Sequence, residues 1–362
     1  MALKRSAVHH LTGAPDGAGA TMGARFGWEL PVTISTASEE YLAAATDVAV
    51  HDISYVGRLH ATGADALDLL NRLSTNKVDG LATGQGAPTT LTTDAGRILD
   101  LIHVVNMGGH TLIITSPELQ QTVIDWLDRY TIMEDLDVED HTTGNTLLHL
   151  LGPNSRQWLE KTGRVDLRGL NPHGVVSAQV TGVPVSVIDK PVGALPGFAL
   201  LLSNQDAPAM WDHLMESGAT PMGTEAYETV RVENAVPAYG TEMGEPYNPL
   251  EAGLIGSIDF AKGCYIGQEV IARLDTYQKV QKHLVTLRFS PESTPTAGSG
   301  LVQDGRAIGR VTSLSSKPGG VLVGLGYVRK AHASTGARLD LESPAQGWAE
   351  VSGFSQVFGP GE

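Results

Sequence analysis

The sequence predicts an α+β fold that ends in a small β-barrel. Up to about residue 280, stretches with apolar residues at helical spacing alternate with short strand-like runs. After about Lys282 only short alternating runs remain, separated by Gly and Pro, which is typical of a barrel of short strands. The 42 Gly and 19 Pro are spread along the 362 residues, so many short elements joined by turns are expected.

The first ordered region is expected to begin near Arg25. A helix is predicted from about Ala64 to Leu73, where leucines recur at helical spacing. Another helix should begin at Ser116-Pro117, with Ser116 as N-cap and Pro117 as the first helical residue. The remaining helices are expected at 153–161, 207–216 and 224–234, and the strands at 49–53, 56–59, 98–105, 111–115, 146–151, 183–188, 198–202, 283–289, 307–314, 321–328 and 337–341.

Composition narrows the class of protein. A hydrophobic content of 41% and a charged fraction of 18% fit a soluble globular protein, and no stretch approaches the roughly 20 apolar residues of a membrane span. The net charge of −15 argues against a broad nucleic-acid surface, although one or two cations suffice to hold a small anion. The single cysteine excludes a disulfide or an all-cysteine metal or cluster site within one chain. We expect a reducing, cytoplasmic compartment, no membrane partner and no secretory signal, because no apolar segment follows Lys4 and Arg5.

Three parts are expected along the chain. Residues 1–24 are rich in Gly and Ala and are predicted to form a loose tail. Residues 25–280 carry the α+β pattern, and residues 281–358 carry the barrel pattern. We therefore expect two interleaved α+β domains followed by one β-barrel domain.

One short segment gathers reactive side chains. Lys262-Gly-Cys-Tyr-Ile-Gly-Gln-Glu269 holds a thiol, an ammonium, a phenol and a carboxylate within eight residues. A nearby lysine favours thiolate over thiol, and a helix that begins near Gly267 would favour it further. Gly263 and Gly267 allow the backbone to turn or to approach a ligand closely. The alternative is a small buried cysteine in a turn, and the residues alone leave both readings open.

This segment and its continuation Val270-Ile-Ala-Arg273 are similar to the signature of the YgfZ family. The resemblance implies a folate-binding protein that supports assembly or repair of iron–sulfur enzymes. Further blocks resemble the aminomethyltransferases, the T-proteins of glycine cleavage; they are Phe26–Pro31, Val50–Ser54, Gly57-Arg58, Thr62–Ala66, Gly96–Asp100, Arg231–Pro237, Tyr239–Met243 and Pro249–Ala252. The resemblance covers the chain from about residue 24 onward and implies a three-domain cloverleaf around a central folate channel, with tetrahydrofolate or a derivative as ligand.

Three positions depart from the aminomethyltransferase pattern. Their catalytic aspartate falls on Leu101, and Asp100 lies one residue early, on the opposite face of a strand. Their pterin-binding glutamate falls on Leu195, and an asparagine is replaced at Thr115-Ser116. Ordinary one-carbon transfer is therefore not expected from the same contacts.

The resemblance carries two sets of site residues onto this chain. Cys264 and Lys262 are the catalytic candidates. The folate-binding candidates are Arg231, Tyr239, Thr115, Gly263, Tyr265, Gly267, Gln268 and Glu269. Other interpretations remain: Arg231 in a salt bridge with Glu233 or Asp259, Tyr239 packed in the core, and Glu251 at a helix start. His51, His60 and His103 show no metal spacing, so no metal is expected.

Two functions follow from these observations. The first is a folate-binding accessory protein for iron–sulfur proteins, with assembly or client proteins as partners and Cys264 as the functional thiol. The second is a tetrahydrofolate-dependent aminomethyltransferase or demethylase. A scaffold with a vestigial channel is a third, non-enzymatic reading.

Overall fold

The computed structural model describes residues 2–12 and 20–355 of the chain. The chain divides into two compact units. Unit 1 comprises residues 1–71, 77–89 and 101–227, and unit 2 comprises residues 72–76, 90–100 and 228–362. Two short segments of the N-terminal half therefore belong to the unit that also contains residues 228–362.

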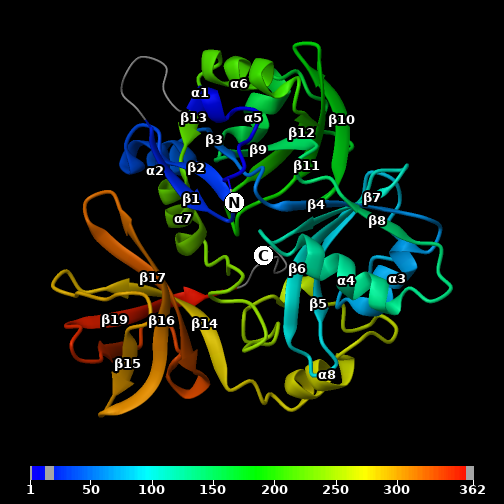
Figure 1. Cartoon of the computed structure of the whole chain (residues 1–362). Coiled ribbons are helices and arrows are strands. Elements are labelled where there is room, and N and C mark those ends of the chain that lie inside the picture. Colours follow the sequence, from blue (N-terminus) through cyan, green and yellow to red (C-terminus); the bar gives the residue numbers. More distant parts are fainter. Residues whose placement is uncertain (1, 13–19, 356–362) are drawn as a thin grey trace. The chain divides into compact units, whose positions relative to one another are not determined.

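Unit 1 is built around a six-stranded sheet and a five-stranded sheet (Figure 1). The six-stranded sheet has the order β10-β11-β12-β9-β3-β13, and the five-stranded sheet has the order β5-β6-β7-β4-β8. Strands β1 and β2 form a separate hairpin. The strands are β1 (Thr21–Arg25), β2 (Trp28–Thr33), β3 (Ala49–Asp52), β4 (Gly57–Thr62), β5 (Gly86–Thr92), β6 (Ile98–Asn106), β7 (Thr111–Thr115), β8 (Asp137–Asp140), β9 (Asn145–Leu151), β10 (Val175–Val180), β11 (Val183–Asp189), β12 (Gly197–Ser203) and β13 (Thr220–Met222).

Helices bury the faces of these sheets. In the six-stranded sheet, Leu148, Leu150 and Leu200 pack in one apolar cluster with Trp158 and Trp211 of two helices. Burial of such side chains is worth about 1.5–3 kcal/mol each, so this cluster is a main source of stability for unit 1. The helices that begin in this part of the chain are α1 (His9–Thr12), α2 (Ala37–Thr46), α3 (Ala66–Leu73), α4 (Gln120–Tyr130), α5 (Ser155–Lys161), α6 (Ala207–Glu216) and α7 (Thr224–Glu233).

Unit 2 contains the predicted barrel, which is closed in the order β14-β17-β16-β15-β18-β19. Its strands are coloured from yellow-orange to red in Figure 1 and are β14 (Lys282–Phe289), β15 (Gly300–Gln303), β16 (Arg306–Lys317), β17 (Val321–Arg329), β18 (Arg338–Leu341) and β19 (Trp348–Phe354). Unit 2 also holds helix α8 (Gln268–Thr276) and the short helices η1 (Ile255–Ser257) and η2 (Lys330–His332). The barrel lies within the predicted range 281–358, of which residues 356–358 are outside the described residues.

Two local predictions were wrong. The N-terminal segment is not a loose tail: Lys4 N donates to Gly27 O at 2.9 Å, Glu29 N donates to Lys4 O at 2.9 Å, and Val8 is fully buried. Residues 13–19 of that segment lie outside the described residues. Helix α4 begins at Gln120 rather than Ser116, because Glu118 has a φ of 65°, which a right-handed helix does not accept.

No helix in the described ranges is long and apolar enough to cross a membrane.

Candidate functional site

The segment from Lys262 to Glu269 lies in unit 2, after η1, and its last two residues form the start of α8. Lys262 is 9% exposed, and its Nζ donates to the backbone oxygens of Ser74 at 2.8 Å and Asn76 at 2.6 Å. The ammonium also lies 5.2 Å from the ring centre of Tyr265. Lys262 thus ties the segment to residues 72–76, and its charge is satisfied by carbonyl oxygens and a ring face.

Further bonds fix the backbone that follows. Ile266 N donates to Arg72 O at 3.1 Å, and the hydroxyl of Thr92 donates to Ile266 O at 2.7 Å. Upstream, Asp259 N donates to Thr75 O at 3.0 Å. Both short N-terminal segments of unit 2 therefore hold the motif in place, which explains why they belong to this unit.

Tyr265 anchors the segment in an apolar cluster with Ile258 and Ile271, against which Leu250 packs. Its side chain is buried, and burial raises the pKa of its phenol to about 12. The hydroxyl therefore stays protonated at neutral pH, so Tyr265 is suited to packing and hydrogen-bond donation rather than to work as a base.

The two glycines of the motif differ in whether their positions could accept a side chain. Gly267 has a φ of 82° and caps α8, and a Cβ there would lie 2.5 Å from Thr93 O. Gly263 has nothing within 4 Å of the position of a Cβ. The prediction of a helix that begins near Gly267 is confirmed by α8, and only Gly267 requires the absence of a side chain.

We expect Gly267→Ala to lower the free energy of unfolding by about 2 kcal/mol or more, because a left-handed conformation costs a non-glycine residue about 1–2 kcal/mol and the backbone contact adds to it. Gly263→Ala is the matched control and should change stability by less than about 0.5 kcal/mol. Urea unfolding of both variants measures the difference. Equal stability of the two variants would contradict the described geometry.

Cys264 carries the thiol of the motif, and this residue is exposed. The alternative prediction, a small buried cysteine in a turn, is therefore wrong for this chain. Gln268 is half-buried at the first position of α8, and Glu269 is exposed and pairs with Arg273 at 3.7 Å. An exposed pair of this kind contributes little to stability. The thiol and the Glu269 carboxylate are thus the groups of the motif most accessible to an incoming molecule.

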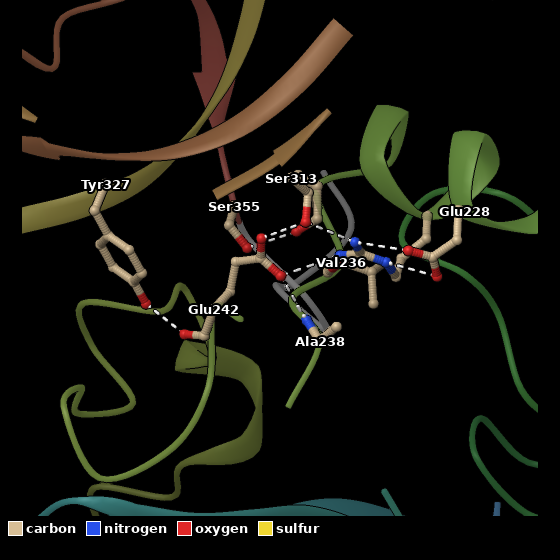
Figure 2. Close-up of polar contacts among 9 residues, drawn as sticks. Glu228, Val236, Ala238, Glu242, Ser313, Tyr327 and Ser355 are labelled. Atoms are coloured by element: carbon tan, nitrogen blue, oxygen red, sulfur yellow. Dashed lines mark hydrogen bonds and ion pairs between the residues drawn. The ribbon is translucent and has the colours of Figure 1, made fainter. Parts of the chain in front are cut away.

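Arg231 belongs to a second polar centre in unit 2. Figure 2 labels Glu228, Glu242 and Ser313 of this centre. Its guanidinium donates to Val236 O at 2.7 Å, to Ser313 Oγ at 2.8 Å, to Glu242 Oε2 at 3.2 Å and to both oxygens of Glu228 at 3.1 and 3.2 Å. A guanidinium has five N–H donors, and these bonds use all of them. A folate contact of Arg231 would have to replace one of these bonds.

Glu242 is the buried counterpart of Arg231 and has no exposed surface. One carboxylate oxygen accepts from Arg231 and from Ala238 N at 3.0 Å, and the other accepts from Ser313 Oγ at 2.6 Å. The hydroxyl of Tyr327 donates to Glu242 O at 2.7 Å. The expected salt bridge of Arg231 exists, but its partners are Glu228 and Glu242 rather than Glu233 or Asp259.

Tyr239 lies in the same unit and is half-buried. Burial raises the pKa of its phenol, and the negative charges of Asp100 and Glu245 raise it further. Asp100 is fully buried on β6, whereas Leu101 beside it is half-buried, as alternation along a strand requires. The carboxylate of Asp100 therefore lies close enough to Tyr239 to act on its phenol.

Thr115 belongs to unit 1, where it is buried at the end of β7 and its hydroxyl donates to Ser116 O at 3.0 Å. Leu195 is in unit 1 as well, in a tight turn closed by mutual backbone bonds with Val192 at 3.0 and 3.1 Å.

Glu251 lies in unit 2 and is buried, and this burial raises the pKa of its carboxyl. Its carboxylate pairs with the ammonium of Lys282 at 3.9 Å.

The part of the chain that the structure describes contains no group of three or more His, Cys, Asp or Glu side chains arranged to hold a metal ion.

Comparison with known proteins agrees with this fold. The family model of the GCVT N-terminal domain matches residues 11–262. The chain belongs to the GCVT family. Among curated proteins, the "Putative transferase At1g60990, chloroplastic" of Arabidopsis thaliana is 37% identical over 295 residues, which is 80% of this chain and 67% of that protein. The aminomethyltransferase of Symbiobacterium thermophilum is 30% identical over 343 residues, covering 88% and 90% of the two chains.

The solved structure of glycine cleavage system aminomethyltransferase T from Bartonella henselae has a TM-score of 0.85 with this GCVT-family chain and covers 98% of both chains at 22% identity. At this identity the likeness shows the fold, and it confirms the predicted aminomethyltransferase-like fold with its C-terminal barrel.

The sequence did not reveal which residues support the motif. Ser74, Asn76 and Thr92 lie more than 170 positions from their partners and carry no motif of their own. Glu242 stood within a recognised block but had no role assigned. No local pattern marked it, because its partner Arg231 stands 11 positions earlier in the chain.

Proposed function

We propose that this GCVT-family protein binds tetrahydrofolate or a derivative and supports the assembly or repair of iron–sulfur proteins, with Cys264 as the functional thiol. The observation that carries the proposal is the placement of Cys264: an exposed thiol on a backbone that Lys262, Ile266 and Tyr265 fix through buried contacts. An exposed side chain whose backbone is fixed by buried contacts is typical of a functional residue, because function requires the reacting group to be held in place. The likeness of residues 262–269 to the YgfZ signature supports the same reading.

The chain has a single cysteine, and this limits the chemistry that Cys264 can support. One thiol per chain supplies one ligand, so any cluster would be shared with a partner protein, a second subunit or glutathione. Helix α8 begins at Gln268, four residues after Cys264. Lys262 contributes by holding the frame, since its ammonium is engaged by Ser74 and Asn76.

The experiment replaces Cys264 with Ser and measures the activity of an iron–sulfur enzyme in cells that lack this protein. The wild-type chain should restore the activity, and Cys264→Ser should restore less than a tenth of the gain. Because Cys264 is exposed, the variant should unfold at the same urea concentration as the wild type. Ala261→Ser, an exposed position three residues away, is the control and should rescue fully. Full rescue by Cys264→Ser would reject the role of the thiol.

The second candidate is a tetrahydrofolate-dependent aminomethyltransferase. It is favoured by the relatives named aminomethyltransferase, which align with most of this chain at about 30% identity. The predicted alignment of Leu101 with their catalytic aspartate argues against it, because a leucine cannot steer protons or stabilise developing positive charge.

A further inference from the structure

A cavity of about 260 Å³ lies in unit 1 beside the N-terminal segment. Its wall consists of residues 4–7, Trp28 of β2, Ser54 after β3, Thr143 and Asn145 at the start of β9, and Asn204 after β12. All of these residues belong to unit 1, whereas Cys264 belongs to unit 2. The cavity is therefore not part of the motif around Cys264, and a ligand bound in it does not depend on the proposed function.

Lys4 brings an unpaired positive charge to this wall. Its backbone is fixed beside β2, since Lys4 N donates to Gly27 O and Glu29 N donates to Lys4 O, both at 2.9 Å. Its ammonium lies 5.9 Å from the ring centre of Trp28, and within residues 2–12 and 20–355 this ammonium takes part in no hydrogen bond or ion pair. The guanidinium of Arg5 is instead paired with Glu29 at 2.6 Å. Among the described residues that line the cavity, none carries a carboxylate.

A buried guanidinium orients the amide of Asn145. Arg58 has no exposed surface, and its Nε donates to Asn145 Oδ1 at 2.5 Å. Its other nitrogens donate to the backbone oxygens of Asn145 and Ser54 at 3.1 and 3.2 Å. Because the amide oxygen of Asn145 accepts from Arg58, its Nδ2 is left for another partner, and it donates no hydrogen bond within the described residues. The charge of Arg58 itself interacts with Asp52 and Asp140, so Arg58 serves the cavity by orientation.

Hydroxyl groups supply further donors. Ser54 is 2% exposed, and its Oγ accepts from Leu147 N at 3.1 Å, which leaves its hydrogen available. The hydroxyl of Thr143 makes no hydrogen bond in the part of the chain that the structure describes. The amide of Asn204 is already engaged, because it accepts from the hydroxyl of Thr146 at 2.8 Å and donates to Thr143 O at 2.9 Å. The wall thus offers an ammonium, an amide N–H and two hydroxyls to a ligand.

We propose that this cavity binds a phosphate group, either free or as the monoester of a small compound. Lys4 is its charged anchor, and the side chains of Ser54, Thr143 and Asn145 donate hydrogen bonds to its oxygens. The ammonium and the amide N–H only donate, so the ligand has to supply the acceptors. An anion is favoured over a neutral acceptor, because hydrogen bonds from donors to an ionised oxygen are stronger and the lining residues bring positive charge.

The origin of the donors favours a phosphate over a carboxylate. They come from three separate segments, which are the N-terminal segment, the loop after β3 and the start of β9. A phosphate monoester presents three acceptor oxygens around one phosphorus, whereas a carboxylate presents two oxygens in one plane. Donors from several segments therefore suit the phosphate. The ring of Trp28, which is 4% exposed, adds an apolar surface for the body of a monoester.

The test is isothermal titration of the full-length protein with sodium phosphate at pH 8, where the anion is mostly divalent. Wild type should bind one phosphate per chain. Lys4→Met and Asn145→Asp should bind at least tenfold more weakly, because the first removes the ammonium and the second replaces the N–H donor with a negative oxygen. Asn145→Asp keeps the acceptor for Arg58. Lys161→Met and Asn171→Asp are the matched controls at exposed positions of unit 1 outside the cavity wall, and they should bind as wild type does.

No binding by wild type, or unchanged affinity of either folded variant, would overturn the proposal. Lys4 is exposed, so Lys4→Met should keep the urea midpoint of the wild type, and its affinity decides the matter if Asn145→Asp does not fold. Cys264→Ser should bind phosphate as wild type does, because Cys264 lies in unit 2. Loss of the Cys264-dependent rescue therefore leaves these results unaffected.

Two further titrations of the wild-type chain define the ligand class. Sodium acetate should bind at least tenfold more weakly than phosphate, and equal binding would reject a phosphate site. Glycerol 3-phosphate distinguishes the two forms of the phosphate group. Tighter binding of this monoester than of inorganic phosphate would assign the cavity to a monoester, and equal or weaker binding would assign it to the free anion.

Discussion

Replacing Glu242 with Ala is expected to lower the free energy of unfolding by about 3–5 kcal/mol, because it leaves the guanidinium of Arg231 buried without its fully buried counter-charge. Ser313 and Ala238 also lose the acceptors that their hydroxyl and N–H groups use. The loss should appear in chemical unfolding followed by the fluorescence of unit 2.

The control for this variant is Glu233→Ala. Glu233 pairs with Lys317 on the surface of the same unit, where an ion pair contributes about 0–1 kcal/mol. A cost below 1 kcal/mol for Glu242→Ala would show that the Arg231 centre does not hold the unit together. In that case, Arg231 would be available for the folate contact that the family resemblance predicts.

Acid is expected to destabilise unit 1 well above the pH at which its carboxylates titrate. Burial lowers the pKa of His103 and His149 to about 3, whereas the unfolded chain titrates near the ordinary value of 6.5. Between these values the unfolded state binds more protons than the folded state, so stability is present above pH 6.5 and is lost as the pH falls. Each histidine contributes a slope of up to about 1.4 kcal/mol per pH unit.

The measurement is the urea midpoint of unfolding from pH 7.5 down to pH 4.5. His149→Gln should reduce the slope by up to half of the contribution of the two histidines, because an amide can still donate to Lys190 O but does not titrate. His10→Gln, at an exposed position, should leave the slope unchanged. Stability that is constant over this range would contradict the buried, neutral state of these imidazoles.

The sequence predicted most of the regular elements, because their signals are local. The helix expected at 207–216 is α6, where Pro lies in the first turn, and the strand expected at 111–115 is β7. The barrel was predicted by its short alternating runs, but β15 and β19 were missed. Both have weak local patterns, because β15 has only four residues and Gly353 interrupts the apolar alternation of β19.

The candidate site was predictable only in part for the same reason. The eight residues of the motif stand together in the sequence, so their chemistry was visible. The hydrogen bonds of Lys262 to Ser74 and Asn76 join positions 188 and 186 residues apart, and no local sequence pattern predicts them.

We predict from the aminomethyltransferase pattern that Leu101 stands where those enzymes have their catalytic aspartate. This departure would separate the two functional readings, since it would leave folate binding possible while removing the carboxylate that one-carbon transfer needs. Whether the chain performs this transfer is therefore the most direct question about its function. The purified protein is incubated with tetrahydrofolate and an aminomethyl donor, and the formation of 5,10-methylenetetrahydrofolate is followed beside a tetrahydrofolate titration on the same sample. We predict that tetrahydrofolate binds and that no methylene product forms above the rate without protein. Catalytic turnover would contradict the proposed accessory role and establish an aminomethyltransferase.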